Sequence, residues 1–218
     1  MLRYRCLVLD HDDTTVDSTR AINYPQFRQA LAHFRPEMSM TEEEYFLYCF
    51  DPGFYEMCHQ VLHYTPEEMA EHLQMWKDYH KDHHPAFFPG MPEIIRRQKA
   101  EGGLVCVVSH STEDVIRRAY DHAQVPQPDL IFGAEQPEEH CKPNPWPMEQ
   151  ILATFQLEPH QVLMVDDMPQ GGIMAKACGV EFAVAGWYGM LPQIRQQMEH
   201  RGNYYFFDLA AFSQFLFP

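Results

Sequence analysis

Five short runs of nearly continuous apolar residues constrain the fold of this chain more than any other feature. They are YRCLVL at 4–9, LVCVV at 104–108, LIF at 130–132, VLMV at 162–165 and FAV at 182–184. Runs without polar alternation are typical of strands that are buried on both faces of a parallel sheet. Amphipathic stretches at 115–120, 148–155 and 171–178 lie between the later runs and are typical of helices. The pattern therefore predicts a three-layer α/β domain.

Residues 18–88 break this alternation, because they contain helix signals and no strand-like run. Thr41-x-x-Glu44 and Thr65-x-x-Glu68 are both capping boxes. Two apolar stripes with helical spacing follow, and we interpret both as packing faces: Phe54, Met57, Cys58, Val61 and Leu62, and then Met69, Leu73, Trp76 and His80. We therefore predict an inserted all-helical cap domain at 18–88. The α/β core would comprise 1–17 and 89–218, with 88–90 as a hinge.

Charge and cysteine content exclude several classes of partner. The chain has 16 Lys and Arg against 31 Asp and Glu, a formal net charge of -15. Without a basic stripe to neutralise phosphates, we expect no nucleic-acid partner, and the same acidity argues against an anionic membrane. The six cysteines form no Cys-x-x-Cys pair and suggest reduced thiols. No apolar stretch is long enough for a signal peptide or a membrane span, so we expect a soluble, cytoplasmic protein.

Polar residues follow the apolar runs at the points where the strands should end. Asp10 and Asp12 follow the first run, Ser109 and His110 follow the second, and Asp166 and Asp167 follow the fourth. Lys142 lies in the Pro-rich segment CKPNP, as the only Lys or Arg between Arg118 and Lys176. In open α/β sheets ligands bind beyond the carboxyl ends of the strands. We therefore expect these side chains to converge on one site.

Such a cluster of carboxylates requires a cation, since like charges a few ångströms apart raise each other's pKa. Mg²⁺ suits a few carboxylates together with a phosphate. One carboxylate could attack phosphorus, and a second, two residues later, could protonate the leaving oxygen. Ser109 and Lys142 could bind the phosphoryl oxygens. The set of groups is suited to phosphoryl transfer.

Four motifs appear in one order along the chain: LVLDHDDTTVDS at 7–18, VVSHS at 107–111, CKPNP at 141–145 and VDDMPQGGIMAKACG at 165–179. In this order they resemble the motifs of the haloacid dehalogenase-like hydrolase superfamily. The helical insert between the first two resembles the cap of its β-phosphoglucomutase and phosphoglycolate phosphatase branch. The resemblance implies a Rossmann-like parallel sheet core.

Carried over by position, the resemblance assigns roles to individual residues. Asp10 would be the nucleophile and Asp12 the general acid/base. The side chains of Asp10 and Asp167 and the backbone carbonyl of Asp12 would hold Mg²⁺, with Asp166 nearby. Ser109 and Lys142 would bind the phosphoryl group. His110 is a further candidate for contact with a substrate oxygen, although a histidine in a loop is more often structural or solvated.

Some positions depart from the family pattern or invite other hypotheses. Asp13 stands where the family usually has Gly, Thr15 where it has an apolar residue, and Gly171 where many members have another Asp. For Asp13 and Asp17 we favour helix capping or solvation over metal binding. His80, His83 and His84 lack a third ligand at a fixed spacing, so we favour a solvated helix end. A reactive thiol at Cys141 is a minority hypothesis.

The leading hypothesis is a Mg²⁺-dependent phosphatase that hydrolyses a small phosphorylated metabolite through an aspartyl-phosphate intermediate. A phosphomutase would use the same intermediate and return the phosphoryl group to a sugar phosphate, and the sequence does not separate the two. A receiver-type signalling module also assembles Asp, Ser or Thr and Lys around Mg²⁺. It is disfavoured because its paired acids come early in the chain and its phosphorylated Asp later. Substrate identity and oligomeric state are left open.

Overall fold

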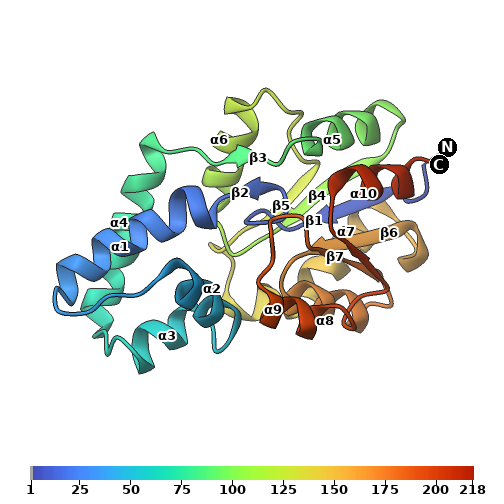
Figure 1. Ribbon diagram of the computed structural model, residues 1–218. Helices are drawn as coiled ribbons and strands as arrows, with labels where there is room; N and C mark the ends of the chain where they lie inside the picture. Colours follow the sequence, from blue (N-terminus) through green and yellow to red (C-terminus); the bar gives the residue numbers. More distant parts are fainter. Residues whose placement is uncertain (1) are drawn as a thin grey trace. The chain divides into compact units, whose positions relative to one another are not determined.

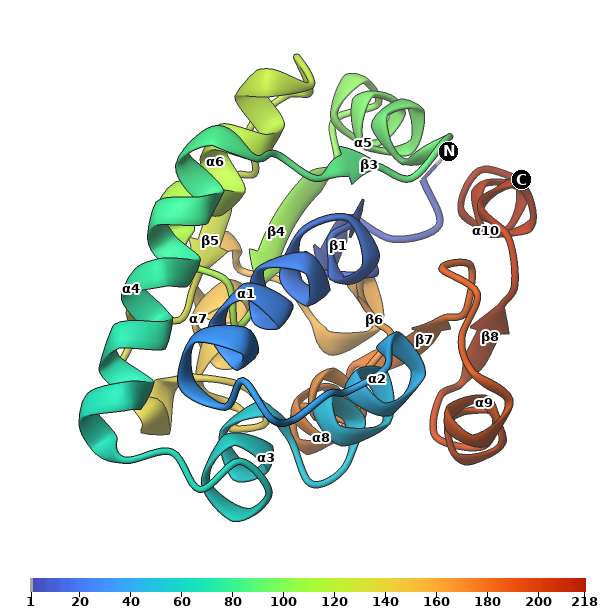
Figure 2. The same cartoon turned by 60° about the vertical axis from the view of Figure 1, so that its left-hand side comes forward.

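The structure is a computed structural model that describes residues 2–218. These residues form two compact units. The first unit comprises residues up to 17 together with 86–218, and the second comprises 18–85. The first contains a six-stranded sheet and the second is helical. Figures 1 and 2 show both units from two sides. Each unit is described separately below.

The sheet of the first unit is parallel throughout, with the order β5-β4-β1-β6-β7-β8. Its strands are β1 (Cys6–Leu9), β4 (Leu104–Val108), β5 (Leu130–Phe132), β6 (Val162–Asp166), β7 (Glu181–Ala185) and β8 (Tyr204–Phe206). Numbered along the chain within this sheet, the order is 3-2-1-4-5-6, the Rossmann arrangement. This confirms the predicted Rossmann-like core. All five apolar runs form strands, and the edge strand β8 was not predicted.

Alternate residues of the central strands face opposite layers of helices. Leu7 and Leu9 of β1 pack into a core with Ile95, Ile116 and Phe212. These come from α5 (Met91–Ala100), α6 (Glu113–His122) and α10 (Leu209–Leu216). On the other face lie α7 (Trp146–Phe155), α8 (Pro169–Ala177) and α9 (Pro192–Met198), as Figures 1 and 2 both show. Two 3-10 turns, Glu138–His140 and Pro159–Gln161, complete the loops of this unit. The two layers bury both faces of the sheet, which explains why the strands lack polar alternation.

A two-stranded ribbon lies where the chain leaves and re-enters the first unit. Strand β2 (Val16–Asp17) pairs antiparallel with β3 (Ala86–Phe87). The prediction that 18–88 contains no strand is therefore wrong at Ala86–Phe87. A ribbon of two residues per strand forms because the outgoing and returning chain run side by side. It is too short to produce a periodic sequence signal.

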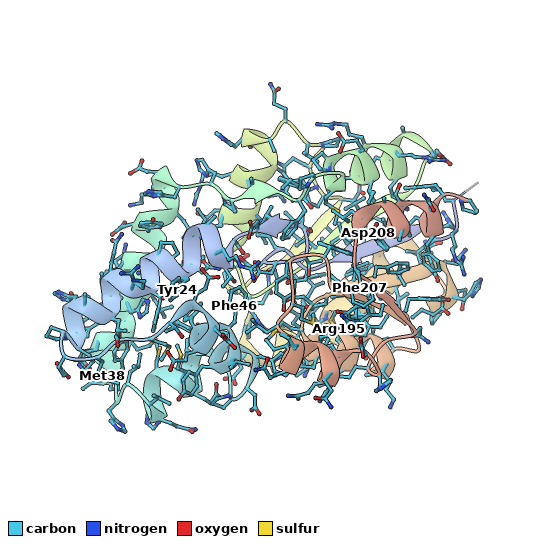
Figure 3. All side chains as sticks on the ribbon, in the orientation of Figure 1. Tyr24, Met38, Phe46, Arg195, Phe207 and Asp208 are labelled. Atoms are coloured by element: carbon cyan, nitrogen blue, oxygen red, sulfur yellow. The ribbon has the colours of Figure 1, made fainter. Side chains whose placement is uncertain are left out.

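The second unit consists of a π-helical turn (Thr19–Asn23) and the helices α1 (Tyr24–Phe34), α2 (Glu42–Phe50), α3 (Phe54–Gln60) and α4 (Pro66–Asp82). Both predicted capping boxes are present at the starts of α2 and α4. Tyr24, labelled in Figure 3, donates its hydroxyl to the carbonyl of Met40 at 2.9 Å. The core is largely aromatic and sulfur-containing: Phe27, Leu31, Met40, Tyr45, Met57, Cys58, Leu62 and Tyr64.

The predicted packing stripe of α4 is partly wrong. His80 is buried, but Met69, Leu73 and Trp76 are only half-buried, whereas His72 is 1% exposed. The buried face is therefore rotated relative to the apolar pattern. Aromatic rings of the core surround the His72 imidazole, and its Nε2 lies 3.1 Å from Oε1 of Gln26, which accepts the hydrogen bond. A hydrogen-bonded histidine can take a core position that hydrophobicity alone assigns to Leu73.

The cysteines and the surface show no disulfide and no membrane-spanning helix among the described residues. The cysteines are free, and the sulfurs of buried Cys6 and Cys106 lie 3.7 Å apart. Phe207, labelled in Figure 3, is 51% exposed, and the guanidinium carbon of Arg195 lies 4.2 Å from the centre of its ring. Within residues 2–218, none of the helices is both long and apolar enough to cross a membrane.

Candidate active site

The predicted acidic residues lie at the point where the strand order of the sheet reverses. In a 3-2-1-4-5-6 sheet this point is between the first and fourth strands, here β1 and β6. Asp10 follows β1 directly, Asp166 is the last residue of β6, and Asp167 is the next residue. Because β1 and β6 pair in register, with Leu9 opposite Val165, the three carboxylates come from adjacent strand ends. The fold thus brings together residues more than 150 positions apart.

Lys142 joins two of these carboxylates. Its Nζ donates to Oδ1 of Asp10 and to Oδ2 of Asp166, each at 2.6 Å. Lys142 is 5% exposed, Asp10 4% and Asp166 0%. Burial alone lowers the pKa of Lys142, but the charges of Asp10 and Asp166 outweigh this effect and hold the pKa above its usual value. Lys142 is therefore an ammonium ion inside the protein.

One ammonium does not neutralise the cluster. Burial raises the pKa of Asp10; the charge of Lys142 opposes this rise, and the charge of Asp166 adds to it. Burial likewise raises the pKa of Asp167 well above its usual range, and the neighbouring carboxylates Asp166, Asp10 and Asp13 raise it further. These rises mark a surplus of negative charge at the strand ends.

The donor set at this point fits a hard divalent cation. Among residues 2–218, Asp10, Asp166 and Asp167 form a group in which one carboxylate oxygen from each residue lies within 4.8 Å of those from the other two. Both oxygens of Asp166 accept hydrogen bonds, one from Lys142 and one from the backbone N–H of Met168 at 2.8 Å. Asp10 and Asp167 are thus better placed as ligands, with Asp166 beside them, and oxygen donors of this kind suit Mg²⁺.

The segment after β1 folds tightly around these carboxylates. Thr15 donates its hydroxyl to the backbone carbonyl of Asp10 at 2.6 Å. Thr14 donates its hydroxyl to Oδ1 of Asp167 at 3.3 Å and accepts from the backbone N–H of Asp167 at 3.1 Å. Trp187 in turn donates its indole N–H to the carbonyl of Thr14 at 2.9 Å. These bonds tie the β1 and β6 ends together.

Neither Asp13 nor Asp17 caps a helix, and the expectation that Asp13 is capping or solvated is wrong. Asp13 is buried, and its backbone has a φ of 54°. A left-handed backbone favours Gly, with Asp among the tolerated alternatives, which accounts for Gly at the equivalent family position. Asp17 is half-buried on strand β2.

Gly171, another departure from the family pattern, also has a structural reason. A Cβ added at Gly171 would lie 2.3 Å from Oδ2 of Asp166. The carboxylate of Asp166 therefore fills the space that a side chain at 171 would need. An Asp at both positions does not fit without displacement of one of them.

Asp12 and the residues after β4 form the other side of the cluster. Ser111 donates its hydroxyl to Oδ2 of Asp12 at 2.6 Å. Ser109 is buried, and its Oγ accepts the backbone N–H of Ser111 at 3.1 Å. His110 is exposed, and its Nε2 lies 2.9 Å from the carbonyl oxygen of Lys142. His110 thus contacts the backbone of the segment that carries the buried ammonium.

The structure adds two residues to those that the sequence assigned. Ser111 and Thr14 make the direct contacts to Asp12 and Asp167 described above, yet neither was given a role. Thr14 belongs to the first motif, LVLDHDDTTVDS, and could have been assigned from it. Ser111 had no comparable signal beyond its place after an apolar run, because its partner Asp12 is 99 positions away.

Other candidates lie apart from this cluster or lack its chemistry. The Sγ of Cys141 points to the carbonyls of Gln136 and Pro137, each at 3.6 Å. Burial raises the pKa of the Cys141 thiol, and nearby glutamates raise it further, so a reactive thiolate is disfavoured. His80 is buried against Trp76 instead of lying at a solvated helix end, while His83 is exposed.

Comparisons with known proteins bear on the same region. The family model described as haloacid dehalogenase-like hydrolase matches residues 7–185. Pyrophosphatase PpaX of Bacillus cereus is 20% identical over 189 residues, which is 85% of each chain. A relative with the PpaX name from Caldanaerobacter subterraneus is 27% identical over 124 residues, and the match spans 56% of its length and 55% of this chain.

Solved structures resemble this chain over nearly its whole length. A predicted phosphoglycolate phosphatase from Haemophilus somnus superposes with a TM-score of 0.74 at 19% identity and covers 99% of both chains. A mutant of CbbY from Rhodobacter sphaeroides, in complex with xylulose-(1,5)bisphosphate, gives a TM-score of 0.75 at 17% identity, with 95% of both chains covered. At these identities the similarity establishes the fold.

Proposed function

The chain belongs to the haloacid dehalogenase-like hydrolase family, and from that premise we propose a Mg²⁺-dependent phosphatase that hydrolyses a small phosphorylated metabolite. The observation that carries this proposal is the buried contact of Lys142 with Asp10 and Asp166, with Asp167 beside them at the strand ends. Buried acids that one ammonium does not balance are suited to a divalent cation and a phosphoryl group.

In the proposed reaction, Asp10 is the nucleophile. Lys142 holds its Oδ1, so the other oxygen attacks phosphorus and forms an aspartyl-phosphate while the bond to the leaving oxygen breaks. Asp12, as a carboxylic acid, gives its proton to that leaving oxygen. Asp12 then takes a proton from water, which attacks phosphorus and releases inorganic phosphate and the Asp10 carboxylate. The two carboxylates thus act in turn.

The remaining site residues bind the transferring group. The Oγ of Ser109 accepts a backbone N–H, which leaves its own O–H to donate to a phosphoryl oxygen. Lys142 supplies positive charge next to the reacting carboxylate, and His110 lies beside it as a candidate substrate contact. When bound by Asp10, Asp167 and the carbonyl of Asp12, with Asp166 nearby, Mg²⁺ would neutralise charge on the phosphoryl oxygens.

Specificity in this proposal belongs to the helical segment. We assign the helical unit, residues 18–85, as a cap that excludes water and selects the leaving group, and the unit with the six-stranded sheet as the core that carries the chemistry. The relative from Bacillus cereus is named a pyrophosphatase, and the CbbY mutant binds xylulose-(1,5)bisphosphate. Both compounds are small and phosphorylated. They support a small phosphorylated metabolite as substrate.

The alternatives are separated by topology and by product. A receiver-type module has a sheet of order 2-1-3-4-5, which differs from the order in this chain. A phosphomutase would share Asp10 and Asp12 and would yield an isomerised sugar phosphate in place of inorganic phosphate. Product analysis therefore decides between the two.

The test is a panel of phosphorylated metabolites assayed for inorganic phosphate with Mg²⁺ and with EDTA. We expect release with Mg²⁺ only. Asp10→Asn and Asp12→Asn should each abolish turnover. Asp13→Gly is the matched control, because it removes a carboxylate from the same segment and suits the left-handed backbone. It should retain activity. Full activity of Asp10→Asn, or indifference to EDTA, would overturn the proposal.

A further inference from the structure

Ser111 is the side chain that holds the proposed general acid/base, and the function proposed above gives it no role. Its hydroxyl donates to Oδ2 of Asp12 at 2.6 Å, and Ser111 is 3% exposed. Its backbone is fixed on both sides, since its N–H donates to Oγ of Ser109 and its carbonyl accepts from Ala134, at 3.1 and 3.0 Å. The hydroxyl therefore extends from a rigid frame.

Asp12 is less buried than its partner. Its side chain is half-buried, and it lies in the segment that follows β1, outside the sheet. A carboxyl group that transfers protons must keep one oxygen directed at the reacting atom. A hydrogen bond to the opposite oxygen restricts rotation about the bond to the carboxyl group, and that is the bond which Ser111 supplies.

The bond also makes the two oxygens of Asp12 different. A carboxylate can only accept from a hydroxyl, so in the ionised form of Asp12 the Ser111 hydroxyl occupies Oδ2, and we assign the transferred proton to Oδ1. Oδ1 is then the oxygen that gives the proton to the leaving group and later takes one from water.

We propose that Ser111 is a positioning residue for Asp12, which fixes Oδ2 so that Oδ1 performs both proton transfers. This inference rests on the proposed phosphatase function and assigns a residue that the motif resemblance left without a role. Ser111 does not contact the transferring phosphoryl group in this assignment. Its removal should therefore affect the protonation of the leaving oxygen, while phosphate binding by Ser109 and Lys142 stays intact.

Leaving-group dependence tests this assignment. An alkyl phosphate from the metabolite panel needs a proton on its leaving oxygen, whereas p-nitrophenyl phosphate releases a stable phenolate and needs little help. In Ser111→Ala, kcat/KM for the alkyl ester should fall about 10- to 100-fold. For p-nitrophenyl phosphate it should stay within about threefold of wild type, because the acid contributes little to that step. Ser111→Thr, which keeps the hydroxyl, should restore the wild-type ratio.

The matched control is Thr112→Ala, which removes the neighbouring hydroxyl, a donor to the exposed Asp114. It should leave the ratio of the two substrates unchanged. Should Ser111→Ala fail to fold, as judged by thermal melting, Ser111→Cys keeps the size of the side chain with a weak donor and is measured in its place.

Three outcomes would overturn the assignment of Ser111. They are an equal fall for both substrates, a rise in KM alone, and no change for either. Failure of the proposed function itself is recognised separately. Wild-type protein without phosphatase turnover, or a fully active Asp12→Asn variant, removes that function and the role of Ser111 with it. If turnover depends on Asp12 and the ratio does not change in Ser111→Ala, only the Ser111 assignment fails.

Discussion

The two units of this chain bury polar groups in opposite ways. At the strand ends of the sheet, three acidic side chains are buried together with the ammonium of Lys142, which bonds Asp10 and Asp166 at 2.6 Å. In the helical unit, His72 is buried as a neutral ring, with burial lowering its pKa to about 4 and Gln26 as its hydrogen-bond partner. A side chain that stays charged although it is buried indicates a catalytic or binding role, whereas a polar side chain that is buried in its neutral form indicates packing.

The largest effect expected from this contrast follows the loss of Lys142. Lys142→Met leaves Asp10 and Asp166 buried without their ammonium partner, and breaking a buried pair in this way costs about 3–5 kcal/mol. Urea unfolding in EDTA measures this loss. Lys176→Met, on the exposed end of α8, is the control and should change stability by no more than about 0.5 kcal/mol. Equal stability of Lys142→Met and wild type would mean that the buried charges are not coupled.

A smaller and pH-dependent effect is expected in the helical unit. The folded pKa of His72 is lowered from 6.5 to about 4 by burial. Between these values the unfolded chain binds a proton that the folded chain does not, so stability falls as the pH falls from 7 to 4. At pH 5 the loss amounts to about 2 kcal/mol.

Hydrogen exchange of peptides from residues 18–85 measures this loss at pH 7 and pH 5, after correction for the intrinsic effect of pH on exchange. His72→Gln keeps a polar side chain without the titration and should remove most of the pH dependence. His83→Gln should preserve it, because the His83 side chain is exposed in the folded protein too. A pH dependence that survives in His72→Gln would contradict the assignment to His72.

The strands of the first unit could be predicted because their signal lies within single short segments of the sequence. Leu104–Val108 and Leu130–Phe132 are strands over the predicted residues, since strands buried on both faces leave an uninterrupted apolar signal. The acidic residues were predicted to converge because each follows such a strand. Strand β8 was missed because Tyr204–Phe206 is half-buried throughout and contains no aliphatic residue, unlike each of the runs that were predicted as strands.

Features set by long-range contacts were beyond sequence patterns. The burial of His72 in place of Leu73 depends on Gln26 and on rings from other helices. The pairing of Ser111 with Asp12 likewise depends on the register of β1 and β4. No spacing within one segment encodes either contact. The left-handed backbone at Asp13 could have been inferred from the family's Gly, because φ above zero is the usual reason for Gly in a tight turn.

The central claim is that the strand-end carboxylates are arranged for a divalent cation, and a calorimetric Mg²⁺ titration of the metal-free protein tests it most directly. We predict that one ion binds per chain and that it raises the free energy of unfolding by about 2.7 kcal/mol at a Mg²⁺ concentration of 100 times Kd. Asp167→Asn should weaken binding at least about tenfold, a loss of about 1.4 kcal/mol, whereas Asp82→Asn, at an exposed position, should not change it. Wild-type protein that shows neither binding heat nor stabilisation by Mg²⁺ would contradict the claim.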